Sequence, residues 1–154
     1  MPDASPSASA SPAPSPSAPL VSFRPTDPED FTVSFFFDRE VDRLWAEWLP
    51  RYWRAATLDR SRLTVVPTGG DVTILIFSDP TRRSYGGAGT VVIYPPFQSA
   101  AFIHELGHVL HCCYGEGTSN GHFITGEPGI MSDPRCAECL LFSDRELREM
   151  GIGR

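Results

Sequence analysis

The run His104-Glu105-Leu106-Gly107-His108 has the pattern HExxH, and it lies within residues 97–114, which we expect to be helical. Residues four apart share one face of a helix, so the imidazoles of His104 and His108 can bind a single ion. Glu105 lies about 100° further round the helix, beside that ion but not bound to it. Its carboxylate is therefore placed to accept a proton from a water molecule that the metal activates.

The residues around this pattern predict a helix that buries one side. Five apolar residues gather opposite the histidines: Phe102, Ile103, Leu106, Val109 and Leu110. All four histidines of the chain fall in one short window: His104, His108, His111 and His122. Histidines scattered over a surface would not cluster in this way. We therefore interpret the group as a metal site rather than as a chance pattern on a solvated helix.

The sequence offers three candidates for the third metal ligand. A catalytic zinc ion has three protein ligands and one open position. His111 lies on the same helix face, but its Cα is about 10.5 Å along the axis from that of His104, which makes convergence awkward. His122 follows a glycine-rich stretch and can fold back onto the helix, so we prefer it, with His111 at the rim of the site. Glu127 is a further candidate, because some zinc sites use two histidines and one glutamate.

Composition limits the class of protein. The chain has 154 residues with 41% hydrophobic content, which is enough for one domain with a core. Its formal net charge is −6, with thirteen arginines, no lysine and no basic cluster. These features give no reason to expect a nucleic-acid or anionic-membrane partner. No apolar run approaches the length of a membrane span.

The first 28 residues differ from the rest. Residues 1–19 are almost wholly Ala, Ser and Pro, so residues 1–28 are expected to be a disordered N-terminal segment. The segment lacks the basic start and apolar middle of a signal peptide. The folded domain is expected to span residues 29–154.

Hydrophobic periodicity predicts the elements that precede the HExxH helix. Alternation indicates a strand over 31–37, and i, i+3, i+4 spacing indicates a helix over 41–56. Asp38 is the expected N-cap of that helix, and Pro50 is expected to kink or split it near Trp48. Further strands are predicted at 63–66, 72–77 and 90–94, with a flexible glycine-rich stretch at 85–89. The order favours an α+β domain with a small mixed sheet.

The end of the chain predicts one more helix. Ser143 and Glu146 have the spacing of a capping box, and Phe142 and Leu147 that of a hydrophobic staple. Gly151 is expected to end this helix.

Three segments together resemble the metzincin zinc peptidases, especially the matrixin-like branch: residues 104–110, Gly121-His122 and Gly129-Ile130-Met131-Ser132. The family pattern is HExxHxxGxxH followed by a Met-turn. The resemblance covers residues 29 to 154 and implies a zincin-like domain with an active-site helix, a Met-turn and a C-terminal helix. It also implies that His104, His108 and His122 bind zinc, that Glu105 is the general base, and that Met131 lies beneath the metal. The nine-residue step from His122 to Met131 is close to the family's spacing.

The sequence departs from the family pattern at two positions. His111 stands where the family has the glycine that bends the chain, and Tyr114 stands where the third histidine would fall. We therefore expect the helix to continue for about one more turn, and an insertion from Cys112 to Asn120 to precede His122.

Four cysteines flank the expected metal loop: Cys112, Cys113, Cys136 and Cys139. We expect them to form disulfides that join the end of the helix to the segment after Met131. A second, structural zinc site is the alternative, because some metzincin relatives carry a late CxxC that residues 136–139 resemble.

The sequence thus predicts a zinc-dependent endopeptidase in which Glu105 accepts a proton from the attacking water and passes it to the leaving amine. The substrate is expected to be an extended peptide or protein segment, lying antiparallel along an edge strand within residues 82–94. We expect a monomer with Zn²⁺ as cofactor and no nucleic-acid or membrane partner. The resemblance implies an extracellular location, although no signal peptide is visible. Two alternatives stay open: a non-catalytic interaction module held together by zinc and disulfides, and a zinc peptidase with Glu127 as third ligand.

Overall fold

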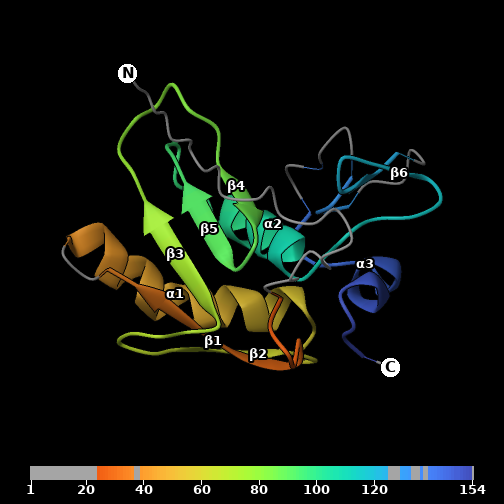
Figure 1. The fold of residues 1–154 in the computed structure, drawn as a ribbon, viewed down its shortest axis with the longest axis horizontal. Coiled ribbons are helices and arrows are strands. Elements are labelled where there is room, and N and C mark those ends of the chain that lie inside the picture. The colour runs from red at the N-terminus through yellow and green to blue at the C-terminus, as the bar shows by residue number, and fades with distance from the viewer. Residues whose placement is uncertain (1–23, 37–38, 125–128, 133–135, 137–138, 154) are drawn as a thin grey trace, which may run out of the picture.

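A mostly parallel sheet forms the body of the protein (Figure 1). The computed structural model describes residues 24–36, 39–124, 129–132, 136 and 139–153. Five strands make up the main sheet: β1 (Asp30–Phe35), β2 (Arg62–Val65), β3 (Val72–Ile76), β4 (Tyr85–Gly87) and β5 (Thr90–Ile93). Their order is β2-β1-β3-β5-β4. The predicted α+β class is therefore confirmed at this coarse level.

The strands have the composition that their positions in the sheet require. β1, β2, β3 and β5 are parallel neighbours, and the inner strands β3 and β5 are short runs of Val, Ile, Leu and Thr that are largely buried. In β3 the buried positions alternate, since Val72, Ile74 and Ile76 are buried while Thr73 and Leu75 are half-buried. β2 and β3 follow one another in sequence but are not paired, because β1 lies between them.

The edge strand β4 was not predicted. It lies within the glycine-rich stretch that we expected to be flexible, and it pairs antiparallel with β5. The connection is a two-residue turn, in which Ala88 and Gly89 both have positive φ angles, 51° and 76°. Two consecutive residues with positive φ make the hairpin turn that best matches the twist of the flanking strands.

Helix α1 (Glu40–Ala56) connects β1 to β2. It buries Trp45, Leu49 and Trp53, so the aromatic residues of this segment belong to the core, as interpreted. The helix continues through Pro50, and the predicted split near Trp48 does not occur. The fully buried side chains of Leu49 and Trp53 on either side of the proline hold this part of the helix in place. The N-cap residue is Arg39, while the expected cap Asp38 lies outside the described residues.

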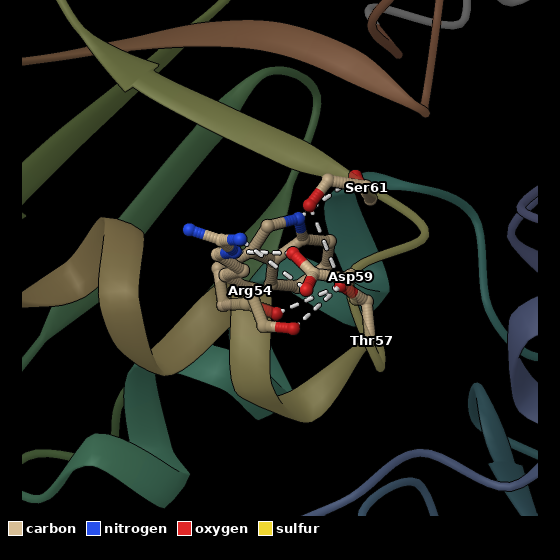
Figure 2. A network of polar contacts seen from close by, with 5 residues as sticks. Arg54, Thr57, Asp59 and Ser61 are labelled. Atoms are coloured by element: carbon tan, nitrogen blue, oxygen red, sulfur yellow. Dashed lines mark hydrogen bonds and ion pairs between the residues drawn. The ribbon is translucent and has the colours of Figure 1, made fainter.

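A polar network fixes the connection from α1 to β2 (Figure 2). The Trp53 indole Nε1 donates to Ser61 Oγ at 2.8 Å, and Ser61 Oγ donates to the Pro28 carbonyl at 2.7 Å. Thr57 Oγ1 donates to the Trp53 carbonyl at 2.9 Å. Together these bonds anchor the end of the helix to the strand that follows and to the residues that precede β1.

Helix α2 (Ser99–Val109) follows β5 and carries the HExxH pattern. The ring of Phe102 stacks on Trp45 of α1 with 4.1 Å between centroids, so the two helices pack against each other beneath the sheet. All five residues predicted for its apolar face are buried. The opposite face is covered as well, since His104 and Glu105 are each only 5% exposed. Both faces of this helix are therefore largely buried.

The last part of the chain folds beside α2. It contains a two-stranded hairpin of β6 (Thr118–Ser119) and β7 (His122–Phe123), followed by α3 (Asp144–Glu149). The predicted capping box at the start of α3 is confirmed, because both the Ser143 and the Glu146 bonds are present. The ring of Phe142 packs against that of Trp53 with 5.5 Å between centroids, which connects the C-terminal part of the chain to α1. Among the described residues, no helix is both long and apolar enough to cross a membrane.

The expected boundary at residue 29 between an N-terminal segment and the domain stays a prediction. Residues 1–23 lie outside the described residues.

Candidate metal centre

The two histidines of α2 direct their rings toward one another. His104 and His108 are one turn apart, and their Nε2 atoms lie 3.1 Å apart. His104 is buried and His108 is half-buried. The four-residue spacing therefore brings both imidazoles to one point inside the fold.

Backbone carbonyl groups fix the tautomers of both rings. His104 Nδ1 lies 2.7 Å from the Ile130 carbonyl oxygen, and His108 Nδ1 lies 3.2 Å from the Cys112 carbonyl oxygen. A carbonyl oxygen only accepts, so each Nδ1 carries the proton that it donates. The neutral rings then present an unprotonated Nε2, which is the lone pair that a metal ion binds.

His122 reaches the same point from a β-hairpin. Asn120 and Gly121 form its two-residue turn, with φ angles of 52° and 79°, and Ser119 pairs with His122. The Gly121 carbonyl accepts a hydrogen bond from the Cys113 backbone N–H at 3.0 Å, which holds the turn against the chain just after α2. Asn-Gly between short strands is the strongest local signal for such a hairpin. Sequence reasoning treated this stretch as a loop and missed it.

The three imidazoles have the spacing of a metal site. His122 Nε2 lies 3.1 Å from His104 Nε2, and the candidate ligand atoms of all three residues lie within 4.8 Å of one another. Nitrogen ligands about 2.0–2.1 Å from a tetrahedral zinc ion are themselves ~3.3 Å apart. Unprotonated Nε2 atoms facing one another would repel, and a cation at their centre would remove that repulsion. The donor set therefore fits an ion such as zinc.

A turn around Met131 packs against the helix that carries His104 and His108. The Phe123 backbone N–H donates to the Met131 carbonyl at 2.8 Å, so β7 is joined directly to this turn. Met131 is fully buried, and a Cβ built on Gly107 of α2 would overlap its sulfur atom. The Met131 side chain thus occupies the space beside the helix that a side chain at position 107 would need.

His111 does not belong to this group. It is exposed, its φ angle is +71°, and its ring lies 4.9 Å from that of Tyr114. The helix ends at Val109 rather than continuing for another turn, so the expected extension is wrong. The chain bends at His111 in the left-handed conformation that glycine adopts most easily. The chain therefore bends at position 111, where the family pattern has a glycine, even though this sequence has a histidine there.

Two further expectations from the sequence concern Glu127 and the cysteines. Glu127 lies outside the described residues. The cysteines pair within each neighbouring couple, Cys112 with Cys113 and Cys136 with Cys139. The expected disulfides between the end of the helix and the segment after Met131 are therefore wrong. Each pair lies too close in sequence to join those distant segments.

Glu105 and two of the three clustered histidines border an open cleft of about 550 Å³. Its walls include His104, Glu105 and His122, together with Ser132 and the residues just before β4. The strand β4 packs directly on α2, since a Cβ built on Gly86 would overlap the Glu105 carbonyl oxygen. Within the predicted range 82–94, β4 alone forms the sheet edge, because β5 has neighbours on both sides.

Comparison with known proteins adds little to this geometry. No protein-family model matches the chain, and no curated protein matches it. Among solved structures, the chain is similar to myroilysin, with a TM-score of 0.39 and 16% sequence identity, over 58% of this chain and 51% of the myroilysin chain. A likeness at this level assigns neither a fold family nor an activity.

Proposed function

We propose that the chain is a zinc-dependent endopeptidase with a zincin-like fold. One observation carries this proposal: three imidazole Nε2 atoms converge beside the carboxylate-bearing residue Glu105 in an open cleft. His104, His108 and His122 would hold the ion. When bound, zinc would polarise the scissile carbonyl and make water a stronger nucleophile.

Glu105 is the residue that we assign as general base. It follows His104 in the same buried helix turn, and it is one of the residues that line the cleft. A carboxylate there accepts the proton of the attacking water and then delivers it to the leaving amine. A purely structural metal site has no use for a carboxylate in this position, which favours catalysis over an interaction module.

The edge strand β4 is the surface that we propose for the substrate backbone. Its outer edge has no partner strand in the main sheet, and the strand lies against the backbone of Glu105. An extended peptide that pairs with such an edge is held by main-chain hydrogen bonds and brought past the catalytic residues. A Cβ at Gly87 would meet nothing within 4 Å, so the absence of a side chain there leaves room for a second chain to approach.

Metal content and cleavage of an unstructured protein such as casein test the proposal. We expect one equivalent of zinc in the wild type, loss of zinc in His108→Ala and His122→Ala, and retention in His111→Ala. Glu105→Gln should retain zinc and lose cleavage by a factor of roughly 10² or more. Cleavage by Glu105→Gln at the wild-type rate would overturn the catalytic assignment. Bound zinc without any wild-type cleavage would instead favour the interaction module.

A further inference from the structure

Two consecutive arginines border the cleft that contains Glu105. Arg82 and Arg83 lie just before β4, and both contribute to the cleft wall together with Tyr94 and Gln98. The protein as a whole has a net charge of −6, so these two arginines make this part of the surface more positive than the chain as a whole. Among the described residues of the cleft wall, Glu105 is the one acidic side chain.

The two arginines differ in what they contact. Arg82 Nε lies 3.6 Å from Asp79 Oδ2. A hydrogen bond with the Tyr94 side chain is the main cause that raises the pKa of Arg82, and the charge of Asp79 adds to it. Arg82 is therefore held by groups of the protein itself.

Arg83, in contrast, is available to bind a ligand. Its side chain is exposed, and it forms no ion pair with any residue that the structure describes. A guanidinium beside a peptide-binding cleft is suited to a carboxylate, which it binds through two parallel hydrogen bonds.

The direction of β4 shows which part of a bound peptide would meet Arg83. A peptide that extends the sheet antiparallel to β4 places its C-terminal half beside the start of that strand. Gly86 lies against Glu105, and Arg83 precedes it by three residues, which is roughly 10 Å of extended chain. Arg83 therefore lies beside the second or third peptide residue after the bond that would be cleaved next to Glu105.

We propose that Arg83 selects substrates that carry a carboxylate two or three residues after the cleaved bond. The carboxylate comes from an Asp or Glu side chain or from the C-terminus of the peptide itself. This inference rests on the proposed peptidase function and adds a substrate class to it.

Three peptides of one backbone sequence separate these sources. The first has Gln at the third position after the cleaved bond and an amidated C-terminus. The second has Glu there with the same amide, and the third has Gln as its last residue with a free carboxylate. Cleavage gives kcat/KM for each peptide, and fluorescence anisotropy gives the Kd of each labelled peptide for the Glu105→Gln protein.

We expect a roughly threefold to fivefold preference for one or both carboxylate peptides over the neutral peptide, in kcat/KM and in Kd, as is typical of a solvent-accessible ion pair. Arg83→Gln should abolish this ratio, and Arg83→Glu should invert it. Arg43→Gln, which removes an exposed arginine from α1, should preserve it. The ratio should also shrink in 0.5 M salt, because added ions screen exposed charges.

A preference that persists in Arg83→Gln, or equal values for all three peptides, would overturn the inference. Cleavage of all three peptides at equal rates would leave the peptidase proposal standing. If no peptide is cleaved, the peptidase proposal fails, and the Kd ratio still decides whether Arg83 binds a carboxylate.

Discussion

Glu146 Oε1 accepts a hydrogen bond from the backbone N–H of Met131 at 2.7 Å, so the carboxylate that caps α3 also holds the turn around Met131. The other oxygen, Oε2, accepts from the Ser143 backbone N–H at 2.7 Å. The residue before Met131 is Ile130, whose carbonyl fixes the ring of His104. A short chain of bonds therefore connects the last helix of the protein to one of the metal-site histidines.

We expect Glu146→Ala to lower the free energy of unfolding by about 2 kcal/mol, because it leaves the buried Met131 N–H without its acceptor. Zinc affinity should fall as well, since the turn that orients His104 loses its support. Urea denaturation and competition with a chelator measure the two effects. Glu149→Ala, which removes an exposed carboxylate from the same helix, is the control. Equal zinc affinity in wild type and Glu146→Ala would show that the turn does not orient His104.

Gly121→Ala should weaken zinc binding by roughly tenfold. Position 121 has a φ angle of +79°, and a Cβ there would lie 2.9 Å from the His108 ring. Gly69 offers a matched control, because its φ angle is +69° but a Cβ would meet nothing within 4 Å. Both substitutions should cost about 1 kcal/mol of stability from the left-handed backbone. Only Gly121→Ala should alter zinc affinity, and a similar loss in Gly69→Ala would refute the steric explanation.

Gly86→Ala should lower both stability and cleavage, while Gly87→Ala should do neither. A methyl group at 86 would overlap the Glu105 carbonyl and push β4 away from α2, whereas a methyl group at 87 meets nothing within 4 Å. Overpacking of this kind costs about 1–3 kcal/mol. Thermal unfolding and casein cleavage report the two effects. If both variants behaved alike, close packing of β4 on α2 would not matter for the site.

His111→Gly should retain zinc and raise the free energy of unfolding by about 0.5 kcal/mol. Glycine relieves the cost of the positive φ angle at this position but adds backbone entropy to the unfolded chain. Tyr114→Ala controls for the ring contact that the substitution removes. Loss of zinc from His111→Gly would contradict the exclusion of His111 from the metal group.

The pH dependence of stability should depend in part on Asp59. A hydrogen bond from Arg54 is the main cause that lowers the pKa of the Asp59 carboxyl below its usual value. A lowered folded pKa stabilises the protein above the unfolded pKa, and this contribution disappears as the pH falls through the folded pKa. Asp59→Asn should therefore cause a small decrease in Tm at pH 7 that disappears progressively below about pH 4. Glu47→Gln, another exposed carboxylate substitution, should not reproduce this pattern.

Local patterns in the sequence predicted the elements whose residues decide their own conformation. The apolar runs of β1, β3 and β5, the helical spacing of α1 and the capping box of α3 all appear in the structure near their expected positions. The pairing of His104 with His108 likewise follows from helix geometry alone. These features need no knowledge of distant contacts.

Features that depend on tertiary contacts were missed. β4 contains two glycines, which are poor strand formers, and it exists because β5 and the backbone of α2 lie beside it. The end of α2 was placed too late, because His111 was not expected in a conformation that favours glycine. The hairpin that delivers His122 was also missed, because a loop was expected where Asn120 and Gly121 form the turn between β6 and β7.

The candidate metal centre depends on whether the turn at Asn120-Gly121 has an even or an odd number of residues. Successive residues of a strand point to opposite sides, so the turn length decides whether His122 or Phe123 faces the other two histidines. One extra residue inside the turn would exchange them, placing an aromatic ring beside His104 and His108 and an imidazole in the core. Extra residues between Cys113 and Thr118 would leave that alternation intact. Insertions or deletions between Cys113 and Thr118 should therefore preserve the histidine group, whereas a change in the length of the turn itself should disrupt it.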